Sequence, residues 1–435
     1  MAKEETKMEK IISLCKRRGF IFQGSEVYGG LSGTWDFAHY GLLLKNNIKN
    51  LWWKRFVKDR SDMYGVDAAI LMNQNVWKAS GHVSGFSDPL VECKKCKHRF
   101  RADQLEDPKK CPDCEGQLGE ARQFNMMFKT NAGPIEGDES VTYLRPETAQ
   151  GMFVNFKNVL DSIHPSLPFG LAQIGKAFRN EIAPRDFIFR SREFEQMEIE
   201  YFVKPDDWKV TFEDFVKEIH SFTTDIGLDK KHVHELEVAD GDRAHYSKRT
   251  IDFEFDFPFG KKELYGLAYR TDFDLKAHSE ASKVDLSYFD EETKTRFIPH
   301  CIEPSFGVER TVLAVLSDAY TEDEIDGEKR VYMKFSPKVA PIKVAVFPLL
   351  KNKPHLVEKA KEVFTMLKKE IEDVVFDDNG NIGKRYRRQD EIGTPYCVTV
   401  DFDTVEKDAG VTVRNRDTGK QERVKIEDLT KYLKI

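Results

Sequence analysis

The sequence has no hydrophobic run that approaches the roughly 18 residues needed for a membrane-spanning helix. Its first ten residues are polar and charged and lack the apolar stretch of a secretory signal. It also lacks a basic excess, because 68 Lys and Arg residues face 74 Asp and Glu residues, for a net charge of −6. These absences predict a cytoplasmic protein with no membrane partner, in which any contact with a polyanion is local.

Cysteine is scarce, since seven residues in a chain of 435 are too few for a disulfide framework. Fixed-period repeats and low-complexity tracts are also missing. Apolar residues make up 40% of the chain and charged residues 33%, a balance that supports a large core under a well-solvated surface. The length predicts two to four domains and excludes a single small binding module.

Hydrophobic spacing predicts two parts of the chain with different secondary structure. Helical spacing is found from Met8 to Gly19 and again over 44–56, with a glycine-rich loop at 29–35 between them. A hairpin is predicted over 178–203, with its loop around 183–186, and an antiparallel pair over 251–257 and 263–268. We therefore expect an α+β fold, with a mostly antiparallel sheet and flanking helices, for residues 1–336.

Beyond residue 336 short apolar strands alternate with helices. Strands are predicted at 342–347 and 396–400, a helix at 356–367, and a hairpin from 411–415 to 423–426 before a last short helix. This order predicts a separate α/β domain over 337–435.

Four of the cysteines form two CxxC pairs, Cys93 with Cys96 and Cys111 with Cys114, separated by 14 residues. Each pair can present two thiolates to one tetrahedral ion, and four thiolates leave no open position for a substrate. We expect a structural Zn²⁺ site, or a metal-free remnant of one, within an insertion at 91–120. Redox chemistry and coincidence are the alternatives.

Two arginine-bearing segments resemble motifs of the class II aminoacyl-tRNA synthetases. Phe178-Arg179-Asn180-Glu181, followed by the segment 189–198, is similar to motif 2. The phrase EPSFGVER at 303–310, which runs into an apolar helix, is similar to motif 3. Either motif alone is weak, and ordinary surface charge is the competing explanation for 178–192; the two together in this order are specific.

In that family a carboxylate attacks the α-phosphate of ATP, so fixed cations must stabilise charge on the phosphoryl oxygens. The resemblance implies catalytic roles for Arg179 at the α-phosphate and for Arg310 at the γ-phosphate and one face of adenine. Phe194 would stack on the other face. Arginine suits both positions because its planar guanidinium binds phosphate oxygens in pairs.

More specific phrases narrow the resemblance to the dimeric glycyl-tRNA synthetases. They are TYLRPETAQG at 142–151, FEQME at 194–198, RTDFDL at 270–275 and EPSFGVER, and the similarity covers nearly the whole chain. It implies ATP and glycine as substrates, Mg²⁺ as cofactor, tRNA(Gly) as partner, and a homodimer whose interface includes the motif 1-like segment 35–56. The domain at 337–435 would be an α/β anticodon-binding domain.

The resemblance also implies two sets of site residues. Those for ATP are Arg179, Asn180, Glu181, Phe189, Arg190, Ser191, Arg192, Glu193, Phe194, Glu263, Leu264, Gly307, Val308, Glu309 and Arg310. Those for glycine are Arg101, Glu147, Phe194, Glu195, Gln196, Met197, Glu198, Glu303, Pro304, Ser305, Phe306 and Gly307.

Glycine has an ammonium, a carboxylate and no side chain, so a selective pocket needs acidic groups and a filled space beside the α-carbon. Glu147 and Glu198 would hold the ammonium, Ser305 would fill the space, and Glu263 would bind Mg²⁺. Two of these have local alternatives: Glu147 could serve a helix dipole, and Glu263 could be an exposed strand carboxylate. The contact with substrate expected of Arg101 could instead be made by Arg99, two residues earlier.

Three further expectations are open to test. The stretch 204–249 is expected to be a second, charged insertion. The cluster at 383–388 interleaves basic residues with Tyr386, a pattern that favours RNA contact, although an ordinary solvated helix face would look the same. A synthetase for another amino acid, such as proline or threonine, and a non-catalytic RNA-binding protein are the competing functions.

Overall fold

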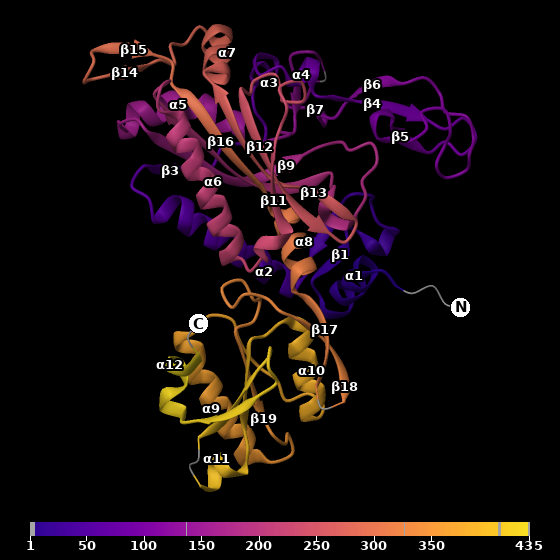
Figure 1. The fold of residues 1–435 in the computed structure, drawn as a ribbon, viewed down its shortest axis with the longest axis vertical. Helices are drawn as coiled ribbons and strands as arrows, with labels where there is room; N and C mark the ends of the chain where they lie inside the picture. Colours follow the sequence, from indigo (N-terminus) through magenta and orange to yellow (C-terminus); the bar gives the residue numbers. More distant parts are fainter. Residues whose placement is uncertain (1–4, 136, 326, 408–409, 434–435) are drawn as a thin grey trace.

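A seven-stranded sheet forms the centre of the larger part of the molecule (Figure 1). The computed structural model describes residues 5–135, 137–325, 327–407 and 410–433. The strand order is β11-β12-β13-β16-β10-β9-β3, and all neighbours are antiparallel except β3, which runs parallel to β9. The bounds are β3 (Met63–Gly65), β9 (Phe169–Phe178), β10 (Glu193–Val203), β11 (Val233–Glu237), β12 (Arg249–Phe257), β13 (Gly260–Thr271) and β16 (His300–Gly307). The predicted antiparallel pair is thereby confirmed. The predicted hairpin exists as β9 and β10, but its bounds were wrong, because β9 ends at Phe178, where the prediction began, and the connection spans 179–192.

Helices cover both faces of this sheet. Four helices, α1 (Lys7–Arg18), α2 (His39–Trp53), α6 (Trp208–Asp225) and α8 (Val308–Ala319), share one hydrophobic core with it. Two others, α5 (Ala149–Ile163) and α7 (Phe273–Ser282), share a second core on the opposite face. The helix predicted to stop at Gly19 does so, because that glycine adopts the left-handed conformation (φ 72°) that closes the helix.

The stretch 204–249, which we expected to be a charged insertion, contributes to the main core. It forms α6 and the edge strand β11, and Phe212, Ile219 and Phe222 of α6 are fully buried against the sheet. Its charged residues occupy the outer face of the helix, which is why the composition alone suggested an appendage.

A small sheet projects from the main body (Figure 1). It consists of β4 (Ser87–Glu92), β5 (Arg99–Arg101) and β6 (Arg122–Asn125), in the order β5-β4-β6. Its core is made of Val91, Leu118 and the four paired cysteines. The remaining short elements of this part are β1 (Ile21–Gln23), β2 (Trp35–Phe37), α3 (Gln74–Ala79), α4 (His82–Gly85), β7 (Lys129–Asn131), β8 (Val141–Tyr143), β14 (Tyr288–Asp290), β15 (Thr295–Phe297), β17 (Tyr320–Ile325) and β18 (Glu328–Met333).

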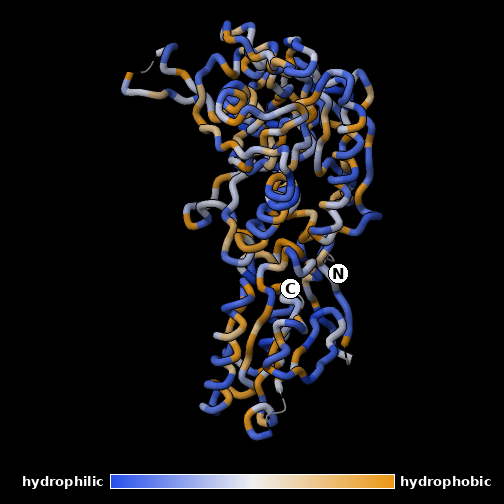
Figure 2. Tube along the Cα trace, turned by 90° about the vertical axis from the view of Figure 1, so that its left-hand side faces the viewer, coloured by the Kyte–Doolittle hydropathy of each residue, from blue (hydrophilic) through white to orange (hydrophobic). Residues whose placement is uncertain are grey.

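The C-terminal part is an α/β unit with its own hydrophobic cores. Its sheet has the order β20-β19-β21-β22-β23, with the first three strands parallel and the last two antiparallel. Figure 2 shows hydrophobic segments running through the middle of this part beside hydrophilic ones. The bounds are β19 (Val344–Pro348), α9 (Pro354–Glu370), β20 (Val374–Phe376), α10 (Ile382–Ile392), β21 (Tyr396–Val400), α11 (Phe402–Glu406), β22 (Val411–Asn415), β23 (Gln421–Val424) and α12 (Leu429–Leu433).

The basic cluster at 383–388 does not form the continuous surface expected for RNA contact. Arg385 is 1% exposed and donates to the backbone carbonyls of Pro348, Asp378 and Gly380. Tyr386 packs its ring on Phe347 and bonds through its hydroxyl to Thr399. Both side chains lie on the inner face of α10, so the expectation was wrong for them, whereas Lys384 and Arg387 remain exposed.

Among the described residues, no helix is both long and apolar enough to cross a membrane.

Candidate active site

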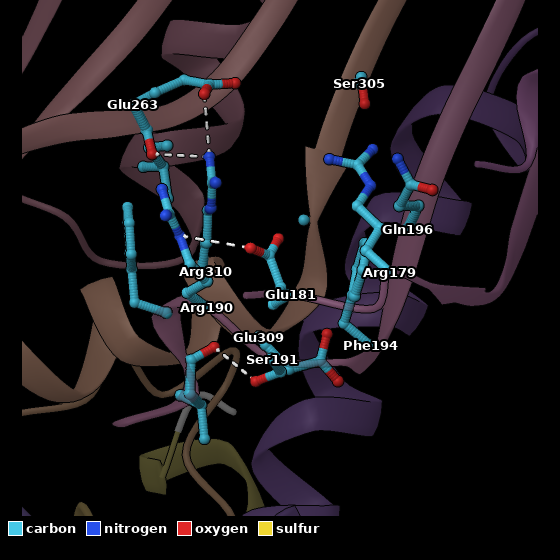
Figure 3. A pocket seen from close by; sticks show the side chains of 14 residues that line it. Arg179, Glu181, Arg190, Ser191, Phe194, Gln196, Glu263, Ser305, Glu309 and Arg310 are labelled. Atoms are coloured by element: carbon cyan, nitrogen blue, oxygen red, sulfur yellow. Dashed lines mark hydrogen bonds and ion pairs between the residues drawn. The ribbon is translucent and has the colours of Figure 1, made fainter. Parts of the chain in front are cut away.

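A cleft opens where the β9–β10 connection meets β13, β16 and the start of α8 (Figure 3). It brings together most of the residues expected at ATP: Arg179, Glu181, Phe189, Arg190, Ser191, Phe194, Glu263, Leu264, Gly307, Glu309 and Arg310. The other four do not line it. Val308 is in the core, Glu193 pairs with Lys176 on the surface, Arg192 bonds to the carbonyls of Ser32 and Glu181, and Asn180 bonds through its backbone N–H to Met126.

The two arginines expected to be catalytic lie on opposite sides of this cleft, with Glu181 between them (Figure 3). The guanidinium of Arg179 lies over the Phe194 ring at 5.3 Å, and its Nε donates to the carbonyl of Pro146 at 3.1 Å. Arg310 lies over the Phe189 ring at 4.5 Å and pairs through Nη1 with Glu263 Oε2 at 3.0 Å. Arg179 also lies over the Phe86 ring at 5.4 Å, so each cation is oriented by aromatic faces and by a polar partner.

Glu309 lines the cleft, and its carboxylate is engaged by a buried cation. Lys45 of α2 places its Nζ 2.5 Å from Glu195 Oε2 and 2.8 Å from Glu309 Oε1. The second oxygen of Glu309 accepts the backbone N–H of Glu195 at 2.8 Å. Both carboxylates are thus engaged within the protein, which assigns Glu195 and Glu309 to holding β10 and α8 together.

A second cleft adjoins the first and shares Arg179, Gln196, Glu263 and Ser305 with it. It adds three acidic residues expected at glycine, Glu147, Glu198 and Glu303. The register β10–β16 puts Ser305 opposite Glu198, and the Ser305 hydroxyl donates to Glu198 Oε1 at 2.7 Å. An acidic pocket therefore opens directly onto the arginine-lined cleft.

The acidic side chains of this pocket perturb one another. Burial and the charge of Glu147 raise the pKa of Glu198, although hydrogen bonds from Thr148 and Ser305 lower it. Burial raises the pKa of Glu303 to about 8, with Arg270 opposing and Glu198 and Glu147 adding to the effect. Such crowding of carboxyl groups is a stable arrangement when a cation joins them.

Arg270 is a site residue that the sequence interpretation did not assign, although its RTDFDL phrase was noticed. It donates to both oxygens of Glu303 at 2.8 and 2.9 Å and to both oxygens of Asp274 at 2.8 Å. Its guanidinium lies 3.8 Å from the centroid of the Tyr246 ring. Arg270 lies at the end of β13 and Asp274 in the first turn of α7, so a helix-spacing rule could not have found the pair.

The remaining residues expected at glycine fall outside the pocket. Met197 and Phe306 alternate with the site residues and point into the core, and Pro304 is buried between strands. Arg101 pairs with Asp88 at 2.7 Å and with Asp103 at 2.7 Å, and it lines neither cleft.

Two carboxyl groups could hold a divalent cation near Arg179 and Arg310. Asp252 and Glu263 both line the acidic cleft. Burial, followed by the charges of Glu263 and Glu254, raises the pKa of Asp252 to about 7. Oxygen ligands of this kind suit Mg²⁺ bound together with substrate phosphates.

The four paired cysteines converge on one point, with all their sulfur atoms within 4.8 Å of one another and no disulfide between them. Gly116 packs directly against this cluster and leaves no room for a side chain, because a Cβ there would lie 3.2 Å from the sulfurs of Cys93 and Cys114 and 2.8 Å from Lys95. The residues therefore fit a tetrahedral Zn²⁺ ion.

Comparison with known proteins agrees with this architecture. Residues 128–319 match the family model of the tRNA synthetase class II core domain (G, H, P, S and T), and residues 343–434 match that of the anticodon binding domain. The chain is 49% identical to a glycine–tRNA ligase of Clostridium acetobutylicum, with 99% of both chains covered. It is 48% identical to those of Caldanaerobacter subterraneus, with 98% of this chain and 97% of that one covered, and Bacillus thuringiensis, with 98% of each. The chain belongs to the glycine–tRNA ligase family of class II aminoacyl-tRNA synthetases.

Proposed function

We propose that this protein attaches glycine to tRNA(Gly) in two steps, through glycyl-adenylate. The observation that carries the proposal is the junction of the two clefts. There an acidic pocket, whose space is limited by Ser305, opens beside two opposed arginines. In such an arrangement an amino acid bound in the pocket would have its carboxylate next to the phosphates of ATP.

In the first step the glycine carboxylate attacks the α-phosphorus of ATP, and the bond to pyrophosphate breaks. Arg179 offsets charge on the α-phosphate, and Arg310, after exchanging Glu263 for the substrate, binds the γ-phosphate. In the second step the tRNA 3′-terminal hydroxyl attacks the activated carbonyl, and AMP leaves. Positioning and electrostatics account for the rate enhancement, since no side chain forms a covalent intermediate.

Glycine is selected by charge and by size. The carboxylates of Glu147, Glu198 and Glu303 surround the position of its ammonium. Ser305, fixed by its hydrogen bond to Glu198, occupies the space that a larger amino acid would need. One additional methyl group costs a substrate about 10- to 200-fold in such a pocket.

Two metal ions accompany this function. Asp252 and Glu263 would hold Mg²⁺, which neutralises phosphate charge. Cys93, Cys96, Cys111 and Cys114 would hold a structural Zn²⁺ that stabilises the 91–120 insertion. The protein acts in the cytoplasm, where protein synthesis occurs.

The macromolecular partners are tRNA(Gly) and a second copy of the chain. The domain at 337–435 contacts the anticodon, through exposed residues such as Lys384 and Arg387 of α10. The dimer forms around the segment 35–56 and the loop before it, where Val27 and Tyr28 are 90% and 92% exposed. Exposed apolar side chains next to each other are typical of a protein interface.

ATP–pyrophosphate exchange with each of the twenty amino acids tests the proposal, with Arg310→Ala as control. Exchange with glycine alone that disappears in the variant is the expected result. Exchange with proline, threonine or another amino acid would keep the class and overturn the pocket assignment. No exchange with any amino acid, in folded protein loaded with metal, would favour the non-catalytic RNA-binding alternative.

A further inference from the structure

A buried histidine outside the expected site residues contacts the pocket carboxylate Glu147. His82 is the first residue of α4 and is 9% exposed. Its Nε2 lies 3.2 Å from Glu147 Oε2, and its Nδ1 lies 2.8 Å from the hydroxyl of Ser80. Both ring nitrogens therefore have a polar partner, so the ring is held at two points.

The contact with Glu147 fixes the role of one ring nitrogen. A carboxylate only accepts hydrogen bonds, so Nε2 carries the proton and donates to Glu147. The rings of Trp77 and Phe86 both pack against the imidazole, each with its centroid 5.5 Å away, which leaves it little freedom to turn.

The second oxygen of Glu147 is also held by a donor. Gln150 Nε2 donates to Oε1 at 3.0 Å, and the same amide donates to Asp274, which pairs with Arg270. Although burial raises it, the charge and hydrogen bond of His82, together with Arg270 and Gln150, hold the pKa of Glu147 well below its usual range. The carboxylate is ionised and fixed in one orientation, with lone pairs still free for a ligand.

We propose that His82 is a positioning residue for amino-acid recognition, which aims the Glu147 carboxylate at the substrate ammonium through its Nε2–H. The inference rests on the proposed function, in which Glu147 is an ammonium ligand. His82 does not touch the substrate in this arrangement. Its loss lowers the affinity for the amino acid while the ATP-binding arginines keep their own partners.

The sharpest test compares His82→Gln with His82→Asn in glycine-dependent pyrophosphate exchange. A Gln amide nitrogen can occupy the place of Nε2 and donate to Glu147, whereas the shorter Asn amide reaches only the place of Nδ1. We expect His82→Asn to raise KM for glycine about 10-fold or more, the equivalent of one charge-assisted hydrogen bond. In His82→Gln the KM for glycine should lie within about threefold of wild type on the same scale. KM for ATP should stay unchanged in both.

A matched control is His234→Asn. His234 also pairs with a carboxylate, Asp256 at 2.9 Å, but on the exposed edge strand β11. It should leave both KM values unchanged.

Several outcomes would overturn the inference. They are equal KM values for glycine in the two His82 variants, or a parallel rise in KM for ATP, which would indicate movement of the whole 77–86 segment. If His82→Asn does not fold, Ser80→Ala replaces it, and an unchanged KM for glycine there would also refute the proposal. Wild-type protein without glycine-dependent exchange would instead refute the proposed function, and this inference with it.

Discussion

The buried contact of Lys45 with Glu195 and Glu309 joins α2 to the arginine-bearing helix α8, and it allows a quantitative prediction. In Lys45→Met the two carboxylates remain in place with side-chain exposures of 14% and 6%. Removing one partner of a buried ion pair typically costs about 3–5 kcal/mol, because the remaining charge stays desolvated. Lys49 still lies 3.2 Å from Glu195, so mainly Glu309 loses its cation. We therefore expect Lys45→Met to lower the free energy of unfolding by about 3 kcal/mol, the lower limit of that range.

Thermal unfolding followed by circular dichroism measures this loss. At about 2 °C per kcal/mol for a large domain, Lys45→Met should lower the melting temperature of the catalytic part by about 6 °C. The unfolding measurement should be made near pH 7. Although burial raises the pKa of Glu195, Lys45 and Lys49 lower it, so the stabilisation is present above the carboxyl's unfolded pKa and is lost as the pH falls through the lowered value.

Lys54→Met is the matched control, because Lys54 pairs with Asp59 at 2.7 Å on the surface and is 63% exposed. An exposed pair contributes about 0–1 kcal/mol, so the control should melt close to wild type. Because Glu309 precedes Arg310, Lys45→Met should also raise KM for ATP in pyrophosphate exchange and leave KM for glycine nearly unchanged. A Lys45→Met protein that melts within about 1 °C of the control would refute the reasoning.

Three further predictions concern separate parts of the chain. Cys111→Ser should lower the bound zinc measured by mass spectrometry and make the 91–120 insertion sensitive to protease, because that small core is built around the cysteines. Since an ammonium favours the ionised form of Glu303, whose pKa is about 8, glycine should bind with release of a proton below pH 8, and its KM in pyrophosphate exchange should fall as the pH rises from 6 to 8. Arg385→Met should lower the melting temperature of the C-terminal part, whereas Arg387→Met should raise only KM for tRNA, because Arg385 is buried and Arg387 is exposed.

Strands and helices with a clear hydrophobic period could be predicted from the sequence. Alternation over 251–257 and helical spacing up to Gly19 both predicted what the structure contains. The stretch 204–249, expected to be a charged insertion, contains helix α6, whose charged outer face dominates the composition. Composition alone did not predict that the apolar stripe of Phe212, Ile219 and Phe222 meets the sheet.

At the candidate site and in the C-terminal part, a motif predicted which residues are near each other but not which way each side chain points. Arg385 and Tyr386 matched a pattern for RNA contact, yet Arg385 donates to backbone carbonyls and Tyr386 packs on Phe347. Similarly, Glu309 was expected at ATP from the motif 3-like phrase, and it lines the cleft, but the motif did not predict that the buried amine of Lys45, 264 positions earlier, binds its carboxylate. Contacts between distant segments of this kind leave no local signal.

The register of β10 against β16 explains why one stretch of sequence can serve both core and chemistry. Met197 and Phe306 pair across the two strands and point into the core, while the next pair, Glu198 and Ser305, points into the acidic pocket. Because side chains alternate with a period of two, a slip of one residue would bury the carboxylate in the core and expose the apolar pair to substrate. The apolar side chains of this hairpin therefore fix the register, and the register in turn fixes the 2.7 Å contact between Ser305 and Glu198 that limits the size of the pocket. A substitution at Met197 should consequently affect amino-acid selection although Met197 never touches the substrate.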